Sequence, residues 1–90
     1  MFKMKYKQTP NLPWRKIEDR AVIISPKTGQ VHELDEVASF LWVLADGVKT
    51  LEETTALLME EFEVEKTIAL QDTREFYHSL ENLGLIQCQS

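Results

Sequence analysis

The chain has 90 residues, 43% of them hydrophobic and 28% charged, which is ordinary composition for a globular domain. The length predicts one domain, and the composition excludes a disordered or fibrous protein. No stretch approaches the roughly 20 apolar residues of a membrane span, and the first residues lack the continuous apolar segment of a signal peptide. The single cysteine, Cys88, cannot form an internal disulfide. We therefore expect a cytoplasmic protein that does not contact a membrane.

The net charge of −5 is unevenly distributed along the chain. Residues 1–20 hold six Lys or Arg against two Asp or Glu, a balance of +4, whereas residues 21–90 carry a balance of −9. Nucleic-acid binding requires basic side chains that displace counterions from phosphates, and most of this chain would repel them. The basic start is compatible both with contact to an acidic partner and with a solvated terminus.

The first third of the chain has the pattern of an arm followed by short strands. Two prolines, Pro10 and Pro13, predict an extended N-terminal arm over residues 1–13, which leaves residues 14–90 as the folded domain. Strands are predicted over 14–17, 20–25 and 30–34, with a hairpin turn at Gly29 between the last two. Together they form a three-stranded antiparallel meander.

After residue 34 the apolar period changes from two residues to that of a helix. Asp35 is the predicted N-cap of a first helix that ends at Asp46-Gly47, with glycine in the left-handed position. Its predicted core face comprises Val37, Ala38, Leu41, Leu44 and Ala45, flanked by Phe40 and Trp42.

Two further helices are predicted downstream. Thr50 and Glu53 form a capping box at the start of the second. The third runs from about Thr67 to Leu83 and ends at Gly84. Its core positions are Ala69, Thr73, Phe76, Leu80 and Leu83, and residues 85–88 form a final strand or a packed tail. Three strands followed by three helices predict an α+β, winged-helix-turn-helix-like domain.

This order of elements resembles the PqqD family, small proteins named for pyrroloquinoline quinone biosynthesis, over roughly residues 10–87. The resemblance is carried by Pro13-Trp14-Arg15, the Pro-Lys-Thr-Gly hairpin, Leu34-Asp35-Glu36-Val37-Ala38, Phe40-Leu41-Trp42, Asp46-Gly47, Thr50-Leu51-Glu52-Glu53 and Leu83-Gly84-Leu85-Ile86. Asp35 stands where the family usually has asparagine, which preserves the cap and adds a charge.

The resemblance implies a non-enzymatic peptide chaperone without a cofactor. Such a protein binds the leader of a ribosomally synthesised precursor peptide and presents it to a modifying enzyme, often a radical S-adenosylmethionine enzyme. The leader is taken up as an added strand between the third strand and the third helix. Edge-strand chemistry supports this interpretation, because an unpaired edge offers N–H and C=O groups to an extended peptide.

On this hypothesis the binding site has two sides. The edge consists of Gln30, Val31, His32, Glu33 and Leu34, and the wall on the third helix consists of Leu70, Thr73, Arg74, Tyr77 and Glu81. The peptide, its modifying enzyme and the oligomeric state stay open, with a homodimer through the N-terminal arm among the alternatives.

The sequence also leaves competing functions to weigh. His32 and His78 have no third ligand at a recognisable spacing, so no metal site is predicted, and Cys88 has no positioned base for catalysis. A winged-helix DNA-binding regulator is the main alternative, although the third helix carries more acidic than basic residues. The second alternative is a docking module that binds a segment of another protein in the same groove.

Overall fold

The computed structural model describes residues 4–89; residues 1–3 of the predicted arm, and residue 90, lie outside them. The α+β class is confirmed, with three helices and two antiparallel sheets of three strands each. In chain order the elements are β1 (Lys5–Gln8), β2 (Trp14–Ile17), β3 (Arg20–Ile24), β4 (Val31–Glu33), α1 (Glu36–Val43), β5 (Asp46–Thr50), α2 (Leu51–Phe62), α3 (Lys66–Asn82) and β6 (Ile86–Gln89).

The predicted meander is present as the sheet β2-β3-β4. Each pair of strands is antiparallel, and the register places Trp14 opposite Ile23 and Ile23 opposite His32. Gly29 adopts φ 72° in the hairpin turn between β3 and β4, as its position in the sequence indicates. Strand β4 is shorter than predicted, because only Val31 to Glu33 form the ladder.

The second sheet, β5-β1-β6, was not predicted from the sequence. Part of the N-terminal arm becomes its central strand, β1, which pairs with the segment before α2 on one side and with the C-terminal strand on the other. Tyr6 of β1 is 5% exposed and packs on Tyr77 of α3, with ring centroids 4.8 Å apart. This part of the arm therefore belongs to the hydrophobic core of its own chain.

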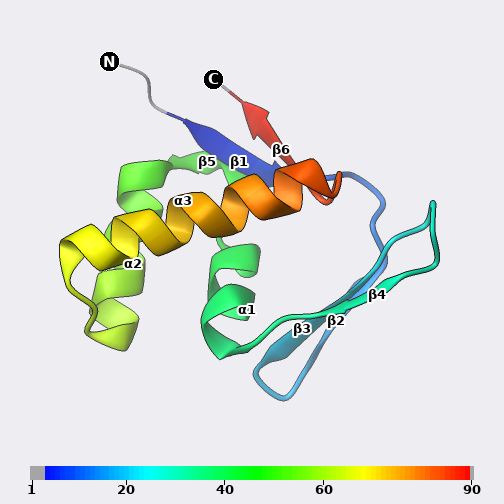
Figure 1. Ribbon diagram of the computed structural model, residues 1–90, viewed down its shortest axis with the longest axis horizontal. Coiled ribbons are helices and arrows are strands. Elements are labelled where there is room, and N and C mark those ends of the chain that lie inside the picture. Colours follow the sequence, from blue (N-terminus) through cyan, green and yellow to red (C-terminus); the bar gives the residue numbers. More distant parts are fainter. Residues whose placement is uncertain (1–3, 90) are drawn as a thin grey trace.

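Helix α1 packs on β3 of the meander, α3 packs on β6 of the second sheet, and α2 lies beside α3 and β5, away from the meander (Figure 1). Helix α2 begins with the predicted capping box of Thr50 and Glu53. Helix α3 ends at Asn82 with Leu83 as its C-cap, and Gly84 follows with φ 76° while the Leu85 N–H donates to the Leu80 carbonyl. That pattern satisfies carbonyls that the helix end would otherwise leave unpaired.

The predicted end of α1 and part of its core face are wrong. The helix stops at Leu44 in a right-handed conformation, and Gly47, with φ 80°, lies inside β5 where the ladder with β1 is irregular. Trp42 is fully buried, whereas Val37 is 37% exposed. The reason is that Trp14 of β2 packs edge-on against the Trp42 ring, so the meander covers the flank of α1 that carries this tryptophan.

Candidate functional site

The meander has an unpaired edge along β4. Within residues 4–89, β4 pairs only with β3. The Ser25 N–H donates to the Gln30 carbonyl, and the Leu34 N–H donates to the Ala21 carbonyl. Because bonded and non-bonded pairs alternate in an antiparallel ladder, His32 also turns its main chain toward β3. Val31 and Glu33 consequently direct their N–H and C=O groups to the open edge.

One buried serine fixes the end of this edge strand to α1. Ser39, 1% exposed, accepts the Ala21 N–H at 2.7 Å and donates its hydroxyl to the Leu34 carbonyl at 3.3 Å. Asp35 then caps α1 by accepting the Ala38 N–H. The hydroxyl therefore replaces the last bond of the ladder and couples β3 and β4 to the helix, which holds the edge in place.

The β4 side chains divide between two faces of the sheet, as the strand period requires. His32 lies opposite the buried Ile23 and is half-buried on the α1 side, with Leu34 on the same face. Val31, 60% exposed, and Glu33 point to the outer face. Gln30 precedes the strand, and it accepts the Ser25 N–H and donates its own N–H to the Thr28 hydroxyl.

A cavity of about 450 Å³ opens at the C-terminal end of β4, between α1 and α3. Leu41 and the half-buried Phe76 supply much of its apolar lining. Its lining residues are Asp35, Val37, Ala38, Leu41, Asp72, Glu75, Phe76 and Ser79. Three of these are carboxylates and none is a lysine or arginine, so this end of the edge is acidic.

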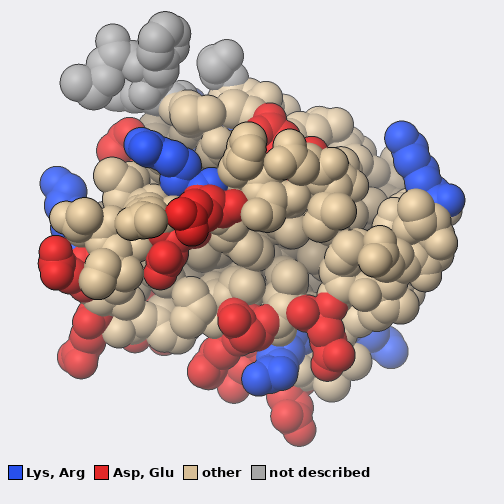
Figure 2. Space-filling view, viewed as in Figure 1, with Lys and Arg blue, Asp and Glu red and all other residues tan. Residues whose placement is uncertain are grey.

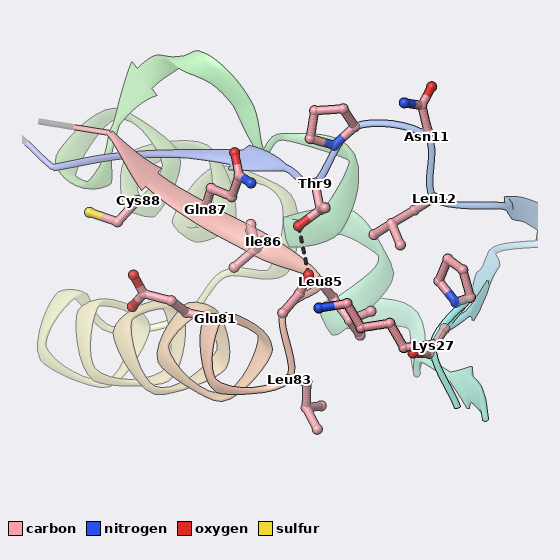
Figure 3. Close-up of a pocket in the computed structure, with 14 residues that line it drawn as sticks. Thr9, Asn11, Leu12, Lys27, Glu81, Leu83, Leu85, Ile86, Gln87 and Cys88 are labelled. Atoms are coloured by element: carbon pink, nitrogen blue, oxygen red, sulfur yellow. Dashed lines mark hydrogen bonds between the residues drawn. The ribbon is translucent and has the colours of Figure 1, made fainter. Parts of the chain in front are cut away.

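A second cavity, of about 820 Å³, lies at the other end of β4, where the hairpin approaches the end of α3. In Figure 3, Lys27 of the hairpin and Leu83, just after α3, lie on one side, and β6 with Cys88 on the other. The Thr9 hydroxyl closes the back of the cavity by donating to the Gly84 carbonyl at 2.7 Å. Helix α3 therefore contributes a wall at both ends of the open edge.

Two residues of the predicted helix wall belong to the core. Thr73 is 0% and Tyr77 1% exposed, and the Tyr77 hydroxyl donates to the Leu41 carbonyl at 2.6 Å. Burial raises the pKa of Tyr77 well above its usual value. These side chains face the interior because α3 packs on α2 and the β1 sheet through the stripe that they occupy, with Ala69 and Leu80.

The other three predicted wall residues lie on a flank of α3 that faces the β1 sheet. Burial raises the pKa of Tyr6 on β1, Cys88 and Glu81 raise it further, and Arg74 opposes the rise. Figure 3 shows Glu81 on the β6 side of α3. Leu70 is half-buried against the core. At a helical turn of 100° per residue, the cavity residues Asp72, Glu75, Phe76 and Ser79 lie on the opposite flank. Of the five predicted wall residues, Glu81 lines the cavity at the hairpin end, and their role in binding stays a prediction.

The two histidines and Cys88 lie on three different elements of the fold. His32 lies on β4 and His78 is exposed on α3. Residues 4–89 hold no group of three or more His, Cys, Asp or Glu placed to bind a metal ion. Over the same residues, no helix combines the length and apolar character needed to cross a membrane.

A comparison with family models decides the relationship. Residues 20–86 match the model described as Coenzyme PQQ synthesis protein D (PqqD). The chain belongs to the PqqD family. The match includes β3, β4 and all three helices, and hence the open edge and both helices that line the cavity beside it.

Two solved structures share the fold of this PqqD-family protein. One, described as TbiB1 in complex with the TbiA(beta) leader peptide, is 28% identical with a TM-score of 0.82, and the alignment covers 90% of this chain and 94% of that one. The other, lasso peptide synthetase B1 complexed with the leader peptide, is 19% identical with a TM-score of 0.81 over 92% and 98% of the two chains. The latter likeness shows the fold alone. Among curated proteins no match was found.

The α3 residues that line the cavity against α1 were not predicted from the sequence. Asp72, Glu75 and Ser79 are polar and each directly precedes a residue predicted to lie in the core, so their pattern is that of any solvated flank. Phe76 was assigned to the core and is half-buried at the cavity. Phe76, a large aromatic residue at the edge of the core stripe, was the one local indication that another element packs near this flank of α3.

Proposed function

We propose that this PqqD-family protein binds the leader of a ribosomally synthesised precursor peptide and presents it to a peptide-modifying enzyme in the cytoplasm. The leader adds as a strand to the β4 edge, and the protein itself catalyses no reaction. The observation that carries the proposal is the open edge itself, where Val31 and Glu33 direct main-chain donors and acceptors outward between two cavities.

The comparisons support this function from a second direction. The structure that is 28% identical over most of both chains is described as a complex with a leader peptide. Family membership adds a link to pyrroloquinoline quinone biosynthesis by name. We propose a radical S-adenosylmethionine enzyme or another peptide-modifying enzyme as the recipient, since a carrier without its own chemistry requires one.

The energetics of strand addition favour moderate affinity. Two residues with outward main chains offer about four hydrogen bonds, each with a net value of about 0.5–1.5 kcal/mol. A leader that becomes ordered on binding loses conformational entropy, which offsets part of this gain and of the burial of its apolar side chains. A Kd of about 1 μM, or roughly −8 kcal/mol, is the expected scale.

An amide NMR titration tests the proposal. The labelled protein is titrated with the N-terminal half of a short precursor peptide encoded beside its gene. We expect the largest shifts at Val31 to Glu33 and around Phe76 on α3. Shifts confined to α2, or no binding by any such peptide, would contradict leader binding at this edge and favour a docking module of another kind.

DNA binding is the alternative that the same experiment addresses. The comparisons give it no support, and α3, which would be the recognition helix, carries Asp72, Glu75 and Glu81 against Lys66 and Arg74. A duplex of random sequence, added at low salt, is therefore expected to leave the spectrum unchanged. Salt-sensitive shifts along α3 with DNA would reverse the choice between the two functions.

A further inference from the structure

The cavity between α1 and α3 combines an apolar interior with an acidic rim. Leu41 is 1% exposed at its base, and Phe76 and Ala38 are half-buried in its walls. Asp72 and Glu75 stand on one wall, one helical turn apart, and Asp35 stands on the other. Figure 2 shows one face of the molecule, where acidic side chains with a few basic ones among them flank an uncharged surface.

The two cavities beside β4 differ in charge. The cavity at the hairpin end is lined by one basic residue, Lys27, and one acidic residue, Glu81. The α1–α3 cavity is lined by three carboxylates and no base. Asp35 is already engaged by the Ala38 N–H and Glu75 by the Gln71 amide, whereas no donor within residues 4–89 pairs with Asp72. The two ends of the edge therefore present different electrostatic surfaces to a bound strand.

We propose that the leader places an apolar anchor side chain in the α1–α3 cavity and carries a lysine or arginine within two residues of it, which pairs with Asp72 and Glu75. This inference rests on the proposed function and specifies which peptides the groove accepts. The cavity volume of about 450 Å³ exceeds what one leucine or aromatic side chain fills, so it also admits the stem of the neighbouring cation.

The spacing follows from strand geometry. A strand added to β4 runs alongside Val31 and Glu33 and passes the cavity as it leaves the edge near Asp35. Side chains two residues apart on a strand lie about 6.6–6.8 Å from each other on the same face. A lysine or arginine in that position reaches the rim while its neighbour fills the interior, and an acidic residue there would meet like charge.

Selection from random peptides tests this inference without a known leader. Phage-displayed peptides of about ten residues, long enough for one strand, are selected on the wild-type protein and on two variants. One variant is Asp72→Asn with Glu75→Gln. The control, Glu52→Gln with Glu60→Gln, removes the same charge from exposed positions of α2 that do not line the groove.

We expect wild type and control to enrich an apolar residue with Lys or Arg within two positions. The rim variant should retain the apolar residue and lose the cation. A synthetic peptide from the wild-type selection should bind the rim variant about three- to tenfold more weakly at about 0.01 M ionic strength, with a smaller difference at about 0.15 M.

The outcomes separate this inference from the proposed function. Enrichment of strand-forming peptides without a preferred cation, or the same preference in the rim variant, would overturn the acidic-rim inference and leave leader binding intact. If no extended peptide is enriched, or if enriched peptides shift no β4 amide in the NMR spectrum, both the inference and the proposed function fail.

Discussion

Replacing Val31 by proline tests strand addition at a single hydrogen bond. The Val31 N–H faces the open edge, so the substitution removes a donor to the leader while the ladder to β3 keeps its bonds. Edge strands tolerate proline where the N–H faces solvent. The Val31 side chain is 60% exposed, so its loss has little effect on the core.

The expected loss of affinity follows from the bond removed. One net hydrogen bond contributes about 0.5–1.5 kcal/mol, and the leader carbonyl left without a donor adds part of its desolvation cost, for a total of about 1–2 kcal/mol. This corresponds to a Kd about five- to thirtyfold higher. The Val31→Ala variant keeps the N–H and should bind within about threefold of wild type, since it loses only exposed apolar contact.

Isothermal titration of both variants with the leader that shifts the wild-type spectrum measures this difference. Urea unfolding checks that each variant is folded, and we expect Val31→Pro to lose about 1 kcal/mol or less because the strand lies at an edge. The His32→Pro variant is a useful comparison. The His32 N–H donates to β3, so removing this N–H should destabilise the meander itself. A folded Val31→Pro variant with wild-type affinity would refute strand addition to β4.

Three further substitutions test the packing that holds the site. Ser39→Ala leaves two buried main-chain groups without a partner, and the free energy of unfolding should fall by about 2–3 kcal/mol in urea titrations. The Thr73 hydroxyl is buried without a hydrogen bond, so the isosteric Thr73→Val should be neutral or stabilising by up to about 1 kcal/mol; a clear loss would indicate an unrecognised partner. Burial raises the pKa of Tyr77, so its neutral form favours the folded state, and stability is retained below about pH 10 and falls as pH rises beyond it. Tyr77→Phe should weaken this alkaline decline and lose about 1 kcal/mol at neutral pH with the bond to Leu41.

The sequence was sufficient to predict the elements that depend on neighbours in the chain. The capping box at Thr50 and the helix stop at Gly84 are local devices, and both are present where they were predicted. The second sheet depends on pairing between residues near opposite ends of the chain, such as Tyr6 with Cys88. No local pattern specifies that pairing. Gly47 illustrates the difficulty. From local sequence it was predicted to end the first helix, whereas its positive φ occurs inside β5, where the pairing with β1 is irregular.

The candidate site depends on tertiary packing in the same way, and its binding residues stay a prediction. Alternation along Val31 to Glu33 identified the edge, but periodicity along α3 could identify only its core stripe. Each flank of that stripe carries one large apolar residue, Leu70 on one side and Phe76 on the other, and both are half-buried against the core.

Which flank of α3 lines the cavity against α1 depends on the direction in which the helix crosses its neighbours, which is a property of tertiary packing. The choice has a functional consequence. The predicted flank carries Arg74 and Glu81, a neutral pair, whereas the flank at the cavity carries Asp72 and Glu75. The same helix therefore implies a leader of different charge according to which flank faces β4, and the peptide selection on the rim variant measures that charge directly.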